Sequence, residues 1–277
     1  MNPPIVVLST ARNVGQWAYR CVSSVREQDT PSTHLFISDA SYDRPDPAGV
    51  SWTDQAVQRA MRIPNRCEET RTVHVKPKKM KGQIPNMVDT IYGLPDEAIV
   101  VHLDGDDWLL PGALKIVREA YASEDVWMTY GQFTHFSGEP GWAREYPSEI
   151  IEANAFREYD FYITHLKTFR AGLFKQIAIT DFLLPAYWGP EDVASGSCVY
   201  PKEPEAWISS AVDIATMFPL IEMAGKHHKF IETPLMIYNN TGNPNSDHNS
   251  GKREFQLAEC KRLMARKPYQ PLTERPW

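Results

Sequence analysis

Three aspartates lie close together in the middle of the chain, directly after a short apolar run. Asp104 and Asp106 flank Gly105, and Asp107 follows at once. Residues i and i+2 of extended backbone point the same way, so a short turn can bring Asp104 and Asp106 onto one cation. Carboxylate oxygens suit Mg²⁺ or Mn²⁺, which complete their shells with water and substrate phosphates. A local interpretation also stays open, in which Asp107 caps the next helix and Asp104 and Gly105 form a turn.

The elements around these aspartates alternate between strands and helices. Short β-branched runs predict strands, amphipathic runs predict helices, and residues 229–239 look strand-like with a break at Pro234. The predicted strands are 5–9, 34–38, 71–75, 98–104 and 126–131. The predicted helices are a first one capped by Asn13, then 52–62, 84–93, 111–122 and 209–226. This order is typical of an α/β fold with a mostly parallel sheet, whose ligands bind at the carboxyl ends of the strands, where Asp39 and Asp104 lie.

Several classes of function are disfavoured by what the sequence lacks. It has neither a GxGxxG nor a GxxxxGK[ST] loop, which disfavours an ordinary dinucleotide or P-loop site. Its four cysteines show no CxxC spacing, so we expect reduced thiols, no zinc site and a cytoplasmic location. No signal peptide and no apolar run of about 18 residues is present, so no membrane span is expected. The net charge of −6 argues against general polyanion binding, although four lysines between 76 and 81 could form a basic patch.

The ordered motifs resemble those of family 2 glycosyltransferases, which have the GT-A fold. The segment "DGDDWLLPGAL" resembles the D-x-D region of the family, and "FISDASYD" resembles its early aspartate turn, with Asp39 and Asp43 on matching positions. The likeness covers about residues 4 to 250. Further matching segments are "IVVLSTARN", "CVSSVREQ", "KGQIPNMVDTIY", "HLKTFRAGLF", "AVDIATMFPLIEMAG" and "YNNTGNPNSDHNS".

This resemblance implies a metal-dependent transfer of a sugar from a nucleotide diphosphate sugar to an acceptor hydroxyl, with inversion. UDP is the commonest nucleotide in the family, and Mn²⁺ or Mg²⁺ would offset the charge of the leaving diphosphate. Asp106 is expected to contact the metal, Asp104 to hold the ribose or share the ion, and His248 to be the third ligand. The implied fold is a GT-A domain with a mostly parallel central sheet and a small second sheet region.

The resemblance also places a nucleotide site and a general base. Asp213 is the expected base, on a helix where Val212 replaces the usual Glu. The pair Glu191–Asp192 has the Glu-Asp sequence that the family usually has at this helix, so Asp192 stays open as an alternative base. Trp142 and Trp188 could stack on a sugar or an acceptor ring. The residues expected at the nucleotide and diphosphate are Thr10, Arg12, Asp39, Lys81, Gly82, Asn86, Asp104, His165 and Lys167.

The domain prediction is one GT-A domain over 1–250, followed by a C-terminal extension over 251–277. Residues 1–107 form the nucleotide-sugar half of that domain and residues 108–250 the acceptor half. The acceptor is left open among glycans, proteins, lipids and modified nucleobases, as are the donor sugar and the oligomeric state. Two other functions are also kept open: a nucleotidyltransferase, and a non-catalytic relative that binds nucleotides or glycans.

Overall fold

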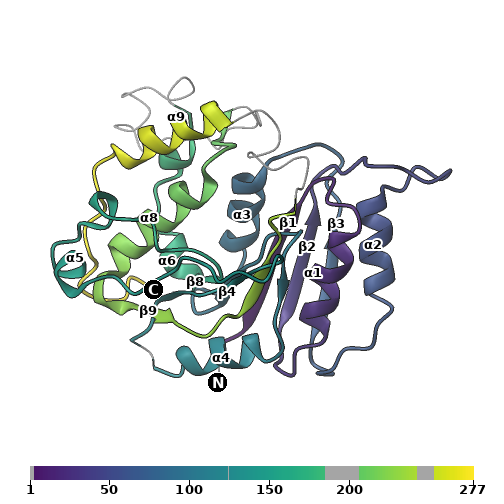
Figure 1. Cartoon of the computed structure of the whole chain (residues 1–277), viewed down its shortest axis with the longest axis horizontal. Coiled ribbons are helices and arrows are strands. Elements are labelled where there is room, and N and C mark those ends of the chain that lie inside the picture. Colours follow the sequence, from purple (N-terminus) through teal and green to yellow (C-terminus); the bar gives the residue numbers. More distant parts are fainter. Residues whose placement is uncertain (1–2, 124, 185–205, 242–252) are drawn as a thin grey trace.

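A seven-stranded, mostly parallel sheet runs through the centre of the molecule (Figure 1). The computed structural model describes residues 3–123, 125–184, 206–241 and 253–277. The strand order is β3-β2-β1-β4-β8-β6-β9, and β8 runs antiparallel to both of its neighbours, β4 and β6. The strands are β1 (Ile5–Ala11), β2 (Thr33–Ser38), β3 (Arg71–Val75), β4 (Ile99–His102), β6 (Met128–Gly131), β8 (Lys167–Arg170) and β9 (His228–Ile231).

A second, three-stranded sheet follows the order β5-β10-β7. Its strands are β5 (Trp108–Leu109), β7 (Thr134–His135) and β10 (Met236–Tyr238). The run 229–239, expected as one broken strand, therefore contributes β9 to the first sheet and β10 to the second. Together the two sheets confirm the predicted α/β fold with a mostly parallel central sheet and a small second sheet.

Helices cover both faces of the central sheet. One apolar cluster contains α1 (Trp17–Arg26), α2 (Trp52–Ala60) and α4 (Ala113–Ala120). The other contains α3 (Gln83–Tyr92), α6 (Ala171–Phe174) and α8 (Val212–Ala224). The four residues of β4 are all buried, which explains why its sequence is apolar on both faces rather than alternating. Shorter helical elements are α5 (Ser148–Glu152), η1 (Phe156–Glu158), η2 (Ile179–Phe182) and η5 (Gly225–His227).

The first helix begins later than the sequence suggested. Asn13 does not cap it: its backbone is left-handed, with φ of 54°, and its side chain accepts the N–H groups of Tyr42 and Asp43 at 2.8 and 3.2 Å. The asparagine therefore holds the loop after β2 against the end of β1. Helix α2 is capped by Ser51, whose side chain accepts the N–H of Asp54 at 3.0 Å.

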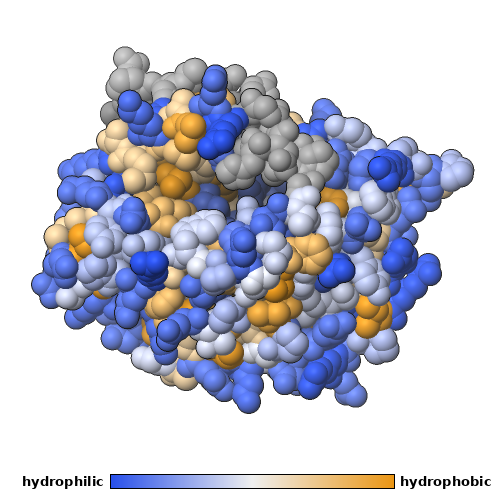
Figure 2. Space-filling view, in the orientation of Figure 1, coloured by the Kyte–Doolittle hydropathy of each residue, from blue (hydrophilic) through white to orange (hydrophobic). Residues whose placement is uncertain are grey.

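The C-terminal residues pack against the helix that carries Asp213. Helix α9 (Arg253–Met264) contributes Leu263 to the core beside α8, and Leu272 N–H donates to the carbonyl of Met223 at 2.9 Å. The face in Figure 2 is mainly hydrophilic, with apolar residues in separate areas. Within the described ranges, no helix is both long and apolar enough to cross a bilayer.

Candidate functional site

Four of the predicted site residues lie at one edge of the central sheet. Strands β1, β2 and β4 end at this edge because they run parallel. The antiparallel strand β8 begins there, with Lys167 opposite His102 in the register. The topology therefore brings Thr10, Asp39, Asp104 and Lys167 to one edge, as expected for ligand sites in open α/β sheets.

The loop after β4 makes a tight turn against the end of β1. The Asp107 N–H donates to the Asp104 carbonyl at 3.0 Å. A Cβ placed on Gly105 would lie 2.4 Å from Ala11 Cβ and 3.1 Å from the Thr10 carbonyl oxygen. Only glycine allows this close approach, which fixes the position of both flanking aspartates.

Asp104 lies between an amide and an ammonium group. Its Oδ1 accepts from Gln83 Nε2 at 3.0 Å, and its Oδ2 is 3.9 Å from Lys167 Nζ. Burial, the largest effect, would raise the pKa of Asp104, but the positive charge of Lys167 and the smaller contributions of His102 and His165 together hold this pKa below its usual value. The carboxylate therefore stays ionised at neutral pH.

Lys167 also pairs with Asp213, the predicted base. Its Nζ lies 2.5 Å from Asp213 Oδ1; the lysine side chain is 1% exposed and the aspartate side chain 40%. Burial alone would lower the pKa of Lys167, yet Asp213 and Asp104 raise it above its usual value. Burial opposes ionisation of Asp213 as well, but Lys167 and His165 bring its pKa well below the usual range. Both groups are therefore charged at neutral pH.

Asp104, Asp107 and His165 form a group that could hold a metal ion. One ligand atom from each lies within 4.8 Å of the others. Around an Mg²⁺-sized ion, ligands at about 2.1 Å lie about 3.0 Å apart when adjacent and about 4.2 Å apart when opposite, so the three groups must move closer together to bind one ion. Burial, followed by the charge of Lys167, lowers the pKa of His165 to about 4, so its imidazole is neutral and able to ligate.

The second oxygen of Asp107 supports this interpretation. Asp107 is buried, and its Oδ2 has no hydrogen-bond partner within the part of the chain that the structure describes. Burial, followed by the charges of Asp106 and Asp104, raises the pKa of Asp107 well above its usual value. A cation beside Oδ2 would offset both the burial and the repulsion. These residues thus fit a divalent ion.

This group differs from the metal ligands expected from the sequence. Asp104 is common to both sets, whereas Asp107 and His165 were expected to serve a turn and the diphosphate. Asp106 is half-buried and lies outside the group of three, so its role as a ligand stays a prediction. The expected third ligand, His248, lies outside the described residues, as do Glu191, Asp192 and Trp188.

The Asp39 side chain is hydrogen-bonded to backbone N–H groups. Its two carboxylate oxygens accept the N–H groups of Lys81 and Gly82 at 2.9 and 2.8 Å. Gly82 has φ of 97° and precedes α3, and Asn86 Nδ2 donates back to its carbonyl at 2.8 Å. The Lys81 ammonium turns to Asp89, 2.7 Å away. These four predicted residues therefore form one unit that sets the start of α3, and contact with a nucleotide stays a prediction for them.

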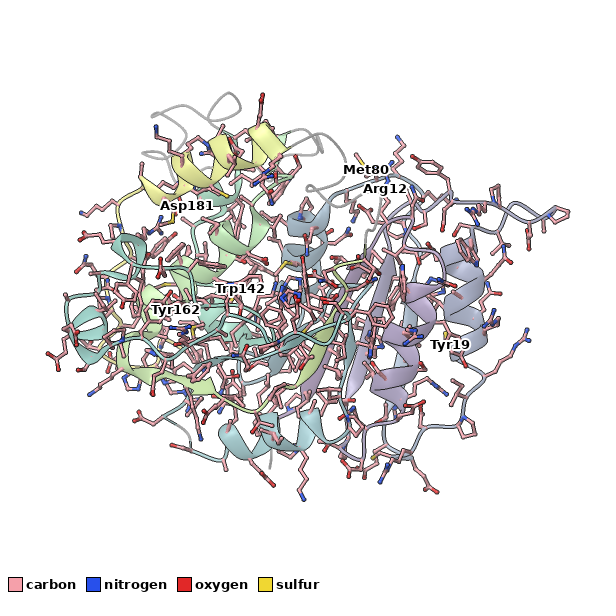
Figure 3. The ribbon with its side chains drawn as sticks, viewed as in Figure 1. Arg12, Tyr19, Met80, Trp142, Tyr162 and Asp181 are labelled. Atoms are coloured by element: carbon pink, nitrogen blue, oxygen red, sulfur yellow. The ribbon has the colours of Figure 1, made fainter. Side chains whose placement is uncertain are left out.

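Thr10 and Arg12 lie where β1 ends. Thr10 is half-buried next to Gly105, and Arg12 Nη1 contacts Met80 Sδ (Figure 3). The Arg12 guanidinium also lies 5.4 Å from the ring centre of Tyr42. The two residues thus border the edge of the sheet that carries Asp39 and Asp104.

An aromatic series leads from His165 towards the surface. The rings of His165 and Tyr238 stack at 5.1 Å, and Phe133 lies 5.5 Å from His165 and 5.0 Å from Trp142. Trp142 is 48% exposed at the end of this series (Figure 3). It is therefore placed near the candidate site with a ring that a sugar could reach, and stacking on an acceptor stays a prediction.

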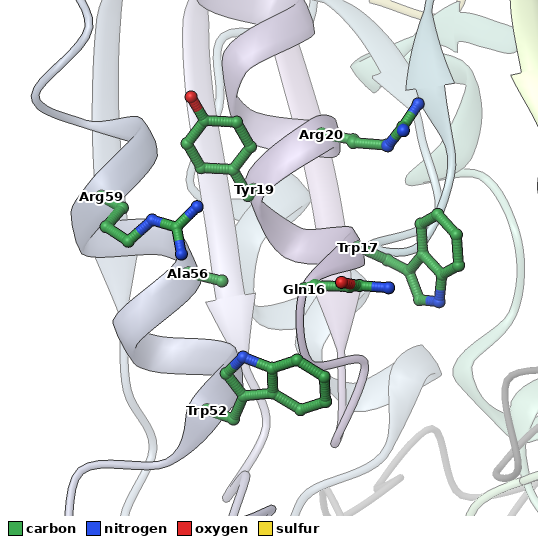
Figure 4. A pocket seen from close by; sticks show the side chains of 7 residues that line it. All are labelled: Gln16, Trp17, Tyr19, Arg20, Trp52, Ala56 and Arg59. Carbon is green, nitrogen blue, oxygen red and sulfur yellow. The ribbon is translucent and has the colours of Figure 1, made fainter. Parts of the chain in front are cut away.

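A separate groove of about 400 Å³ lies between α1 and α2 (Figure 4). Tyr19, Trp52 and Arg59 are among the side chains that line it. It contains none of the residues predicted for the nucleotide, the metal or the base. The candidate site is therefore the set of charged groups at the sheet edge and not this groove.

The chain resembles solved structures in fold rather than in sequence. No family model and no curated protein matches it. The crystal structure of S. aureus TarS aligns with 95% of the chain at 15% identity and a TM-score of 0.56, and TarS 1–349 does so at 15% identity and 0.58. TarS 1–349 in complex with UDP-GlcNAc aligns with 94% at 13% identity and 0.53, and a complex with UDP is also similar.

The alignment supports the expected fold and covers part of the other protein. The chain spans 39% of the length of TarS and 64% of TarS 1–349. At these identities the likeness concerns the fold alone. It agrees with the GT-A arrangement expected for the two sheets and their helices.

Proposed function

We propose that the chain is an inverting glycosyltransferase that uses a nucleotide diphosphate sugar, with UDP as the first nucleotide to test. The observation that carries the proposal is the meeting of Asp104, Lys167 and Asp213 at the carboxyl edge of the sheet. The fold likeness to TarS, whose structures include complexes with UDP and UDP-GlcNAc, supports the same donor class. The motif resemblance to family 2 glycosyltransferases points the same way.

The reaction needs a base on one side of the sugar and positive charge on the other. Asp213 is half-exposed and would accept the proton of the acceptor hydroxyl while that oxygen bonds to the anomeric carbon. The bond from this carbon to the diphosphate oxygen breaks, and the nucleoside diphosphate leaves with the electron pair. Lys167 would bind the leaving oxygens, and Asp213 would later release its proton to water. Asp192 stays the alternative base.

A divalent ion, Mn²⁺ or Mg²⁺, would stabilise the negative charge of the leaving diphosphate when bound. Two sets of ligands are proposed for it: Asp104, Asp106 and His248 from the resemblance, and Asp104, Asp107 and His165 from the grouping of ligand atoms. The histidine in each set favours Mn²⁺ over Mg²⁺, because Mg²⁺ prefers an all-oxygen shell.

The proposed nucleotide site lies along β1, β2 and the start of α3. Thr10, Arg12 and Asp39 border it, and Lys81, Gly82 and Asn86 would shape its wall, because Asp39 fixes their loop. In this proposal residues 1–107 bind the nucleotide sugar and residues 108–250 bind the acceptor. The acceptor is a carbohydrate, a protein, a lipid or a nucleobase. Trp142 favours an acceptor with a ring face, such as a sugar.

The test starts with thermal shifts against a panel of nucleotide sugars, with and without Mn²⁺, since a ligand of the folded state raises the melting temperature. Transfer or hydrolysis of the stabilising donor is then measured for the wild type and for Asp213→Asn. We expect the variant to lose about 10²- to 10⁴-fold in kcat, as for loss of a general base. Asp125→Asn, at a surface residue paired with His227, is the control and should keep full activity. Full activity in Asp213→Asn would contradict the assignment of the base.

A non-catalytic relative that binds nucleotides is the second candidate. Val212 in place of the usual Glu, and the ion pair that occupies Asp213, favour it. Tight nucleotide binding without turnover across a broad panel of acceptors would support this candidate. Release of pyrophosphate from a nucleoside triphosphate would instead indicate a nucleotidyltransferase.

A further inference from the structure

Lys167 is shared between the two halves of the candidate site. Its ammonium contacts the proposed base Asp213 at 2.5 Å and approaches Asp104, on the proposed donor side, at 3.9 Å. It comes from the start of β8, where its backbone is opposite His102 of β4 in the sheet register. A buried ammonium needs carboxylate partners because its desolvation is costly. The position of its charge therefore depends on which anion is nearest.

The two carboxylates differ in how firmly they are held. Asp104 also accepts a hydrogen bond from Gln83, at 3.0 Å. Lys167 is the hydrogen-bond donor to the Asp213 carboxylate among the described residues, and this carboxylate is 40% exposed. A lysine ammonium carries three donors, so it can bind a new anion while it stays near Asp104.

We propose that Lys167 changes partners when the donor binds: it leaves Asp213 for an oxygen of the donor diphosphate, and Asp213 becomes free for the acceptor hydroxyl. This inference rests on the proposed function and adds a coupling between its two sites. The exchange replaces one charge-assisted hydrogen bond by another, so its net cost is small. Without donor, the carboxylate is paired with Lys167 and is a poor proton acceptor, so the base becomes available only when the donor is bound.

A purely structural ion pair would give different binding data. If Lys167 never contacts the diphosphate, its loss should change the binding of UDP and uridine to the same extent. If the exchange takes place, Asp213 and the diphosphate compete for one ammonium. Replacing Asp213 should then strengthen binding of UDP, and this gain should depend on Lys167.

The experiment is a double-mutant cycle read by calorimetry with UDP and with uridine, so that no turnover is needed. Relative to the wild type, we expect Asp213→Asn to bind UDP about tenfold more tightly, and Lys167→Met to bind it about tenfold more weakly, with uridine unchanged in both. In the Lys167→Met background, Asp213→Asn should give little further gain. Lys175→Met is the matched control, because Lys175 pairs with Asp96 and lies outside the site.

Each result decides between the interpretations. An equal gain from Asp213→Asn with and without Lys167 would indicate simple charge repulsion and would overturn the exchange. Equal weakening of UDP and uridine by Lys167→Met would overturn it too. If Lys167→Met does not fold, Lys167→Gln gives the same comparison without the charge. Failure of the wild type to bind UDP, GDP, ADP or CDP would contradict the proposed function itself, whereas UDP binding without coupling contradicts the exchange alone.

Discussion

The carboxylate of Asp107 accepts a hydrogen bond from the backbone N–H of Asn239, 2.8 Å away, although 132 positions separate the two residues. This bond joins the loop after β4 to the end of β10 and orients the aspartate. The other oxygen, Oδ2, is left without a partner in the described ranges, and Asp107 belongs with Asp104 and His165 to the group of close ligand atoms. A buried carboxylate that is half satisfied is a good candidate for a metal ligand.

Metal binding should therefore depend on Asp107 and His165. We expect Asp107→Asn and His165→Gln each to weaken Mn²⁺ binding about 10- to 100-fold, measured by calorimetry without nucleotide. Asp106→Asn is the matched comparison from the same loop. Loss of binding in Asp106→Asn together with normal binding in Asp107→Asn would favour the set derived from the resemblance instead.

The loop that carries the aspartates should not tolerate a side chain at Gly105. In Gly105→Ala, the new methyl would lie 2.4 Å from Ala11 Cβ, so the loop or β1 must shift. We expect a loss of about 1–3 kcal/mol in the free energy of unfolding by urea, the usual cost of overpacking. Gly93→Ala is the control, because its methyl would meet its nearest atom at 3.5 Å and the φ of Gly93 is −83°. Equal stability of the two variants would contradict the tight approach.

Acid should destabilise the chain partly through His34. Burial, followed by the charge of Arg26, lowers the pKa of His34 from 6.5 to about 3 in the folded state. The unfolded chain therefore binds this proton first, and stability present above pH 6.5 is lost as the pH falls towards 3. Between pH 6.5 and 4.5 the free energy of unfolding of the wild type should fall by about 2 kcal/mol more than that of His34→Gln. Urea unfolding at each pH measures this difference. Parallel stability curves for the two proteins would rule out this contribution.

Arg157 and Glu222 should be coupled in stability. The guanidinium forms two hydrogen bonds with the carboxylate, and Glu222 is fully buried. Arg157→Met leaves a buried charge without its partner and should cost about 3–5 kcal/mol. Adding Glu222→Gln should restore part of this loss, because the unpaired charge is gone. Lys175→Met breaks a surface pair and should cost less than about 1 kcal/mol.

Most of the fold could be predicted because its elements have clear local patterns. The buried strand β4 and the helix α2 were placed to within a few residues. The start of α1 was wrong because Asn13 uses its side chain on a loop that is distant in sequence. The antiparallel direction of β8 has no local pattern either, since strand pairing depends on residues far along the chain.

The site could be predicted in part for the same reason. Asp104 and Asp39 follow strands and were expected at the sheet edge, where they lie. The pairing of Lys167 with Asp213 was not foreseen, because the two residues are 46 positions apart and meet only once β8 is inserted beside β4. The reversed strand also brings His165 to Asp107, which the spacing of residues alone does not indicate.

The packing of the C-terminal residues has a consequence for chimeric proteins. Besides Arg157, Glu222 of helix α8 accepts the N–H of Tyr269 at 2.9 Å, and Trp277 lies against Gly172 at the start of α6. The predicted extension is therefore held against α8, the helix that carries Asp213, by packing and hydrogen bonds. A graft that exchanges residues 253–277 with those of another protein should include both α8 and Arg157, because Glu222 would otherwise lose one of its partners.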